Sequence, residues 1–99
     1  MEKEEQKETE KQPLRVDNFL LWVFDTLAEK GWAYLGLVPH PESQKMEEDL
    51  GQVKLVIPLL EKIFELLKEQ VPFQRRIQME TMITNIQLNF VKKQEARKS

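Results

Sequence analysis

The sequence predicts an all-α protein of three helices, and three observations indicate this fold class. Apolar residues recur at helical spacing in three segments, residues that start or end helices bound each segment, and no stretch alternates as a strand would. A chain of 99 residues suits one domain, but it buries only a thin core. We therefore expect a three-helix bundle, or a helical hairpin plus a third helix, completed by oligomerisation.

The chain is expected to form a single helical domain over residues 14–93, between two polar segments. Residues 1–13 contain no apolar residue after Met1, so they are predicted to be a disordered charged tail. Residues 94–99 are predicted to form a second polar tail. Neither segment offers enough apolar surface to offset the entropy of ordering it.

The first helix is predicted at about residues 17–35. The Asp17 carboxylate can accept hydrogen bonds from the first turn, and Gly36 can adopt the left-handed conformation that ends a helix. One broad apolar face is expected to pack in the core, made of Leu20, Val23, Phe24, Leu27, Ala28, Gly31, Tyr34 and Leu35. Trp22, Trp32 and Ala33 fall among the polar residues on the other side, which favours a contact surface over the alternative that both tryptophans tilt into the small core.

The second helix is predicted at about residues 49–70, with Asp49 as its N-cap. Its stripe follows 3-4-3-4-3 spacing over Leu50, Val53, Ile57, Leu60, Phe64 and Leu67. Further apolar residues widen the stripe to more than half of the helix circumference, and all of this broad face is expected to pack in the core. Pro58 lies in the middle of the helix, on its charged side, where it removes one backbone hydrogen bond and favours a bend.

The third helix is predicted at about residues 72–93, with Pro72 in its first turn. The main stripe consists of Met79, Met82, Ile83, Ile86 and Phe90. A second stripe, of Phe73, Ile77, Leu88 and Val91, lies on another face. Two apolar faces on one helix are typical of a helix that packs between neighbours or at an oligomer interface.

The middle of the chain resembles a family of small, mostly bacterial proteins known as the domain of unknown function numbered eighteen forty-four. The resemblance covers residues 19–93 and is carried by the Leu-Gly-x-x-Pro-x-Pro turn at residues 35–41, the Asp-Leu pair at residues 49–50 and the segment 57–60. It implies a first helix, a Pro-x-Pro loop, a second helix and a third helix. Pro58 replaces the family's usual Asp, and Pro72 replaces a usual Thr cap. The resemblance implies no activity.

Composition excludes several classes of protein. The chain has no cysteine, so disulfides, thiolate metal ligands and a thiol nucleophile are absent. The N-terminus lacks the apolar core of a signal peptide, and the longest apolar run, residues 19–24, is far shorter than the ~20 residues that span a bilayer. We expect a cytoplasmic protein with no membrane contact.

The sequence predicts no metal site, no cofactor and no enzymatic activity. His40 is the only histidine, and four carboxylates follow it closely, at Glu42, Glu47, Glu48 and Asp49. A single histidine on a loop beside near-sequential acids is usually solvated, so we interpret His40 as a surface residue. No nucleophile, base and acid are brought together by the predicted helices, and there is no glycine-rich phosphate loop.

The function expected from these patterns is protein–protein interaction through self-association, most simply as a dimer, with a second protein partner as an additional possibility. The predicted interface consists of Phe19, Trp22, Trp32, Phe73, Ile77, Leu88 and Val91. The alternative is a nucleic-acid-associated protein that uses the basic third helix and tail, with Arg75, Arg76, Lys92, Lys93, Arg97 and Lys98. A net charge of −2 and a pI near 5.5 disfavour that alternative.

Overall fold

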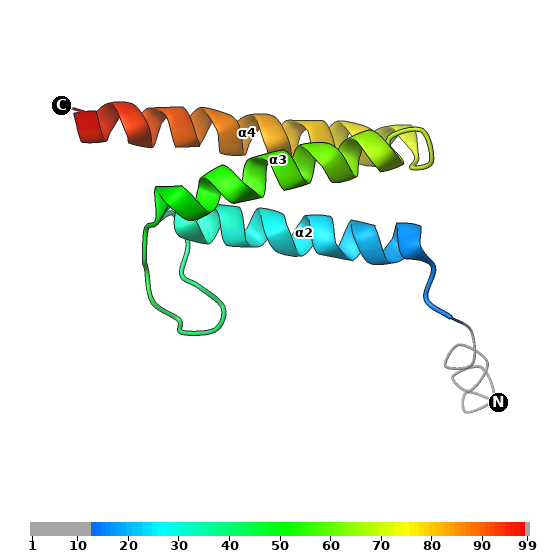
Figure 1. The fold of residues 1–99 in the computed structure, drawn as a ribbon, viewed down its shortest axis with the longest axis horizontal. Coiled ribbons are helices and arrows are strands. Elements are labelled where there is room, and N and C mark those ends of the chain that lie inside the picture. Colours follow the sequence, from blue (N-terminus) through cyan, green and yellow to red (C-terminus); the bar gives the residue numbers. More distant parts are fainter. Residues whose placement is uncertain (1–12, 99) are drawn as a thin grey trace.

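The computed structural model describes residues 13–98 and confirms the all-α fold. The chain forms three helices, α2 (Val16–Tyr34), α3 (Leu50–Leu67) and α4 (Phe73–Lys98), and no strand occurs in this part of the chain (Figure 1). The disordered tail predicted for residues 1–13 falls outside the described residues, except for Pro13, which is exposed.

Helix α2 begins and ends one residue earlier than predicted. Asp17 lies inside the first turn, where its carboxylate accepts from the Asn18 N–H at 2.8 Å and pairs with Arg15 at 3.0 Å. The Arg15 guanidinium lowers the pKa of the Asp17 carboxyl. At the other end Gly36 has φ +78°, and the Leu37 N–H donates to the Trp32 carbonyl at 3.2 Å. This Schellman arrangement satisfies carbonyls that the last turn leaves open.

Helix α3 begins where the sequence predicts, because the Asp49 side chain accepts from the Gln52 N–H at 3.3 Å. It ends at Leu67, three residues before the expected residue 70. Pro58 is exposed on the solvent side, and α3 remains one helical element through it. The missing hydrogen bond therefore faces water rather than the core.

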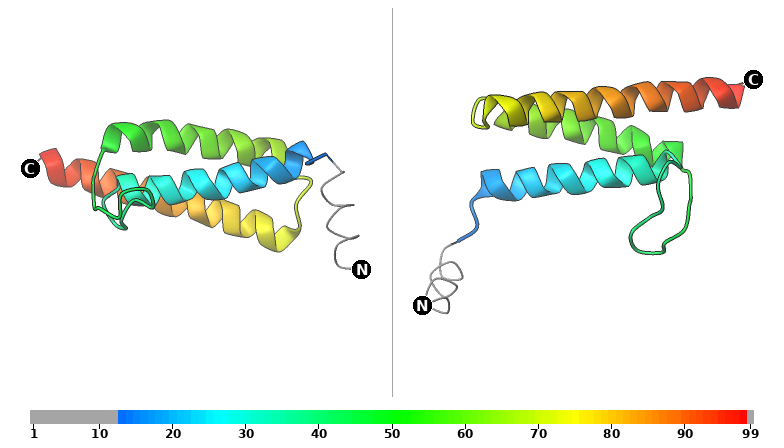
Figure 2. Two further views of the ribbon diagram at one scale, coloured as in Figure 1. Left: turned by 90° about the horizontal axis from the view of Figure 1, so that it is seen from below. Right: turned by 180° about the vertical axis from the view of Figure 1, so that it is seen from behind.

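The core lies along the middle helix, because α3 packs against both α2 and α4 while those two contact each other less (Figure 2). Helix α3 runs antiparallel to its neighbours, so α2 and α4 point the same way (Figure 1). The largest fully buried side chains come from all three helices and their junctions: Phe24, Leu35, Val53, Leu60, Met79 and Ile86. Gly31 permits a close approach, since a Cβ there would lie 3.2 Å from Val56 Cγ1 and 3.4 Å from Ile86 Cδ1.

Helix α4 continues to Lys98, although the sequence predicts an end near residue 93 and a polar tail from residue 94. Tertiary ion pairs support the extra turns, because Glu48 binds Lys93 at 3.3 Å and also Arg97. The hydrogen bond from Arg97 lowers the pKa of the Glu48 carboxyl, and Lys93 acts in the same direction. Periodicity alone misses this stabilisation, since Glu48 lies in the loop between α2 and α3, far from α4 in the sequence.

Candidate protein-binding surfaces

Two groups of large apolar side chains remain exposed in the folded chain. We define the α2–α3 surface as Val16, Phe19, Trp22, Leu55, Leu59 and Leu66, whose exposed fractions run from 44 to 71%. We define the α4 surface as Phe73, Ile77, Leu88 and Val91, with exposed fractions from 45 to 64%. Monomeric proteins rarely leave apolar patches of more than a few hundred Å² in water, so both surfaces need an explanation.

The α2–α3 surface bridges the two helices where Leu66 lies beside Val16. Leu55, Leu59 and Leu66 are spaced by four and seven residues, so they share one side of α3. That side faces α2, because Leu66 lines a surface groove together with Val16 and Leu20. The groove is open to solvent and joins the exposed side chains of both helices.

Aromatic side chains extend this surface around α2. The rings of Phe19 and Trp22 stack with centroids 5.9 Å apart and an interplanar angle of 24°. Trp22 is 62% exposed, although tryptophan is one of the most costly side chains to leave in water. Stacked, exposed aromatics of this kind are enriched where proteins contact one another.

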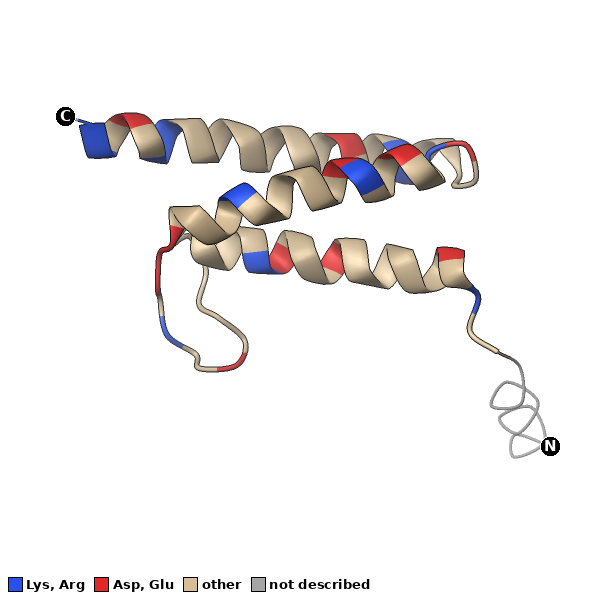
Figure 3. Cartoon of the chain, viewed as in Figure 1, with Lys and Arg blue, Asp and Glu red and all other residues tan. Residues whose placement is uncertain are grey.

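The α4 surface lies on the side of its helix that no other helix covers. Met79, Ile83 and Ile86 point into the core, whereas Ile77, Leu88 and Val91 remain exposed. The eleven residues from Thr81 to Val91 contain no charge, which Figure 3 shows as a long uncharged stretch of α4. At the start of the helix the Arg76 guanidinium lies 5.5 Å from the ring centroid of Phe73.

Of the seven residues predicted at an interface, six are exposed, and the exception is Trp32. Trp32 packs against the core, and its indole N–H donates to the Met82 sulfur at 3.0 Å. The expectation that Trp32 lies outside the core is corrected by this contact. Its neighbour Ala33, which helical spacing also placed on the polar side, is fully buried.

Sequence reasoning missed the contribution of α3 to the exposed surface. Leu55, Leu59 and Leu66 were expected to pack in the core with the rest of the broad stripe, and the structure leaves all three exposed. The sequence did contain one signal: two neighbouring helices cannot cover all residues of an apolar stripe that is wider than half of the helix circumference. The core takes Val53, Val56, Leu60, Ile63 and Leu67 instead.

Ion pairs within the chain occupy half of the basic residues proposed for nucleic-acid binding. Arg75 pairs with Asp25 at 2.7 Å, and Lys93 and Arg97 both pair with Glu48. Arg76 rests on the Phe73 ring. These contacts leave α4 without a continuous row of free cations, which a phosphate backbone would require.

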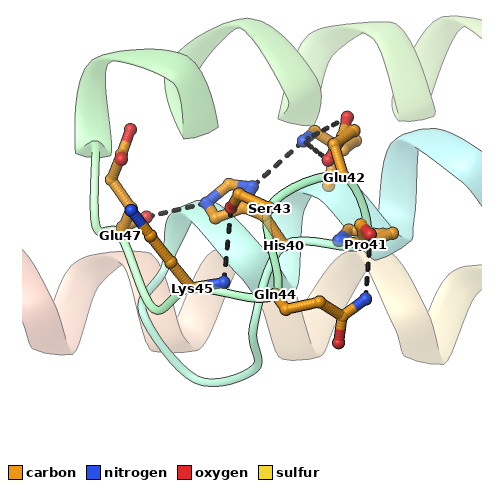
Figure 4. A network of polar contacts seen from close by, with 8 residues as sticks. His40, Pro41, Glu42, Ser43, Gln44, Lys45 and Glu47 are labelled. Carbon is orange, nitrogen blue, oxygen red and sulfur yellow. Dashed lines mark hydrogen bonds and ion pairs between the residues drawn. The ribbon is translucent and has the colours of Figure 1, made fainter.

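His40 is buried, which corrects the expectation of a solvated surface histidine. Its side chain is 5% exposed and makes an edge contact with the Tyr34 ring at 4.5 Å between centroids. Nδ1 lies 3.0 Å from Lys30 Nζ, and Nε2 lies 2.9 Å from the Glu47 carbonyl (Figure 4). Because an ammonium group only donates, Nδ1 accepts from Lys30, and the Nε2 proton is donated to Glu47.

The loop between α2 and α3 is organised around this histidine. The His40 N–H donates to the Lys45 carbonyl at 2.9 Å, and the Gln44 N–H donates to the His40 carbonyl at 2.8 Å. Lys30 also pairs with Glu42 at 2.9 Å, which ties the loop to α2. These contacts attach the loop to the last turns of α2, and Figure 1 shows the loop projecting from that end of the helix to one side of the bundle.

Replacing His40 should loosen the loop. His40→Ala leaves the Glu47 carbonyl without a partner and removes the contact with Tyr34, so we expect a loss of about 1–3 kcal/mol in the free energy of unfolding. Chemical denaturation measures this loss. Ser43→Ala, on the exposed tip of the same loop, should change the free energy by less than about 0.5 kcal/mol. Equal effects of the two variants would contradict a central role for His40.

Among residues 13–98, no three histidine or carboxylate side chains are grouped closely enough to hold a metal ion. Over the same range, no helix combines the length and apolar character that a bilayer crossing requires.

The loop between α2 and α3 borders, together with α2 and α4, an open groove of about 560 Å³, which contains Trp32, Pro39, Pro41 and Met82. The two apolar surfaces remain the features that best fit a binding role.

Comparison with known proteins gives one family. The model for the family described as "Domain of unknown function (DUF1844)" matches residues 18–92 of the 99. No curated protein and no solved structure matches the chain. The family description carries no activity, so the function must be argued from the surfaces.

Proposed function

This chain belongs to the family Domain of unknown function (DUF1844), whose description names no function, and from its exposed apolar surfaces we propose that it acts as a self-associating helical interaction module. The proposal assigns binding and no reaction. Its interface is the α2–α3 surface, and its first partner is a second copy of the chain. One observation carries the proposal, namely the set of exposed apolar side chains on two adjacent helices, two of which, Val16 and Leu66, line one open groove.

The size of the α2–α3 surface supports a stable dimer. Its six side chains are each about half exposed, so together they present roughly 500 Å² of apolar area per copy. Interfaces are roughly 60% apolar, so pairing two such surfaces gives a total buried area of about 1,600 Å². That is the standard size of a specific protein–protein interface.

The composition of the surface also supports pairing with itself. A two-fold axis brings the same patch of both copies together, so the patch must be complementary to itself. An apolar surface with stacked aromatics meets this condition because it carries no dominant charge. Of the three exposed charged residues between Leu59 and Leu66, Lys62 lies nearest to the leucines by helical spacing, and its long stem can lie along apolar surface.

Light scattering after size exclusion tests the proposal. The wild-type protein at tens of micromolar should have at least twice the mass of a single chain, and Trp22→Glu and Leu59→Glu should each weaken the association tenfold or more. Glu65→Lys, on the charged side of α3, should leave the mass unchanged. All variants should keep their helical circular dichroism, because the altered side chains are exposed. A wild-type monomer throughout this range would refute the proposal.

The salt dependence of the assembly separates this function from nucleic-acid binding. Association through apolar surface should hold or strengthen as salt is raised, whereas binding to a polyanion should weaken steeply. A chain that binds nucleic acid tightly in 50 mM salt and loses it near 200 mM would favour the alternative.

A further inference from the structure

Helix α4 carries a second stripe of exposed residues, separate from the stripe that faces the core, with the spacing of a helix–helix contact. The stripe is spaced 4-3-4-3-4 along the helix, and it combines Ile77, Leu88 and Val91 of the α4 surface with the exposed polar residues Thr81, Thr84 and Glu95. This is the spacing with which one helix packs along another. The core-facing residues Met79, Ile83 and Ile86 form a separate stripe, so α4 can contact the bundle and another helix at once.

From this arrangement we propose that α4 pairs with α4 of a second copy in an antiparallel orientation, and that this contact joins two dimers into a tetramer. The inference rests on the proposed self-association and adds a second interface to it. The occupant of the α4 surface is therefore another copy of the chain. Two different isologous interfaces on one protomer close a tetramer with dihedral symmetry.

The side chains that flank the stripe suit pairing between identical helices. Gln78, Asn85 and Lys92 lie along one edge, and Glu80, Gln87 and Gln94 lie along the other; the Gln87 amide also donates to Glu61 of α3 at 3.0 Å. Amides both donate and accept hydrogen bonds, so two copies can face each other without repulsion. The absence of charge from Thr81 to Val91 removes the like-charge contacts that would otherwise oppose self-pairing.

Charge at the helix ends selects the antiparallel orientation. Lys92, Lys93, Arg97 and Lys98 outnumber Glu95 and Glu48, which pairs with Lys93 and Arg97, so the C-terminal end of α4 stays positive and a parallel pair would bring two such ends together. Antiparallel pairing separates them and also opposes the two helix dipoles. In the matching register Thr84 faces Leu88 of the other copy, and Thr81 faces Val91.

The area of the α4 surface predicts a weaker contact than the α2–α3 surface. Ile77, Leu88 and Val91 lie within the paired segment and present roughly 250 Å² of apolar area per copy, whereas Phe73 lies beyond it. If interfaces are roughly 60% apolar, the paired surfaces bury about 800 Å² in total, which is the size of a weak contact. The tetramer should therefore dissociate to dimers on dilution before the dimers dissociate.

Two substitutions separate the interfaces. Wild-type protein near 200 µM should have the mass of four chains by light scattering, and Leu88→Glu should have the mass of two. Leu59→Glu should also form a dimer at this concentration, now through α4, and the double variant should be a monomer. Helical circular dichroism checks that each variant is folded.

The failures of the two proposals are distinguishable in this experiment. If wild type is a dimer and Leu59→Glu is a monomer, the α4 contact is refuted while the α2–α3 dimer stands. If Leu88→Glu is a monomer and Leu59→Glu is a dimer, the α4 contact stands and the α2–α3 interface is refuted. A wild-type monomer at 200 µM refutes both proposals.

Cysteine crosslinking tests the orientation of the pair, because the chain has no cysteine of its own. Residues 77 and 95 are about 27 Å apart along a helix, and a disulfide needs Cα atoms within about 7 Å. A mixture of Ile77→Cys and Glu95→Cys proteins should oxidise mainly to the mixed dimer, which a size tag on one protein identifies. Ile77→Cys should form little disulfide with itself. Efficient Ile77 self-crosslinking without the mixed species would overturn the antiparallel arrangement.

Discussion

Phe24→Ala is expected to lower the free energy of unfolding by about 3–5 kcal/mol, a large part of the stability of a domain this size. Phe24 is 1% exposed and belongs to the core that α2 shares with α3 and α4. Removing its ring takes away buried apolar area and leaves a cavity that the helices can fill only in part. Urea denaturation followed by circular dichroism measures the loss.

Phe19→Ala is the matched control, because it removes the same ring from the exposed side of the same helix. If α2 contributes to a dimer interface, the effect of Phe19→Ala should depend on protein concentration and disappear on dilution. The effect of Phe24→Ala should persist at every concentration. A loss below about 1 kcal/mol for Phe24→Ala would contradict its place in the core.

Gly31→Leu should destabilise the bundle by about 3 kcal/mol, at the upper end of what overpacking costs. A Cβ at Gly31 already lies 3.2 Å from Val56 Cγ1 and 3.4 Å from Ile86 Cδ1, so three further carbons have no space. The contact joins all three helices at one point. The substitution must therefore push α3 and α4 away from α2 or distort their side chains.

Gly51→Leu is the control for the change in helix propensity. Gly51 is exposed in the first turn of α3, and a Cβ there meets only Asp49 Oδ1 within 4 Å. Both substitutions gain up to about 1 kcal/mol from replacing glycine in a helix. We expect Gly51→Leu to change the midpoint of thermal unfolding by only a few degrees. A similarly small shift for Gly31→Leu would show that the three-helix contact is looser than the distances indicate.

Several features of the fold follow from short stretches of sequence. Asp49 starts α3 because its side chain bonds a backbone N–H three residues ahead, and Gly36 ends α2 because it tolerates a positive φ. The spacing of Phe24 and Ala28, and of Met79, Ile83 and Ile86, identified core positions. These interactions are local or periodic, so the sequence carries them directly. The family resemblance, which rests on the same turn and helix start, is confirmed by the family match.

Features that depend on which neighbour covers a face were decided only by the tertiary structure. Trp32 is covered because α4 brings Met82 against it, and His40 is buried because the loop folds back onto Lys30 and Tyr34. Leu59 stays exposed because α3 has only two neighbours for an apolar face wider than they can cover. Periodicity shows which residues share a side of a helix. It contains no information on the partner, since that contact is made by residues distant in the chain.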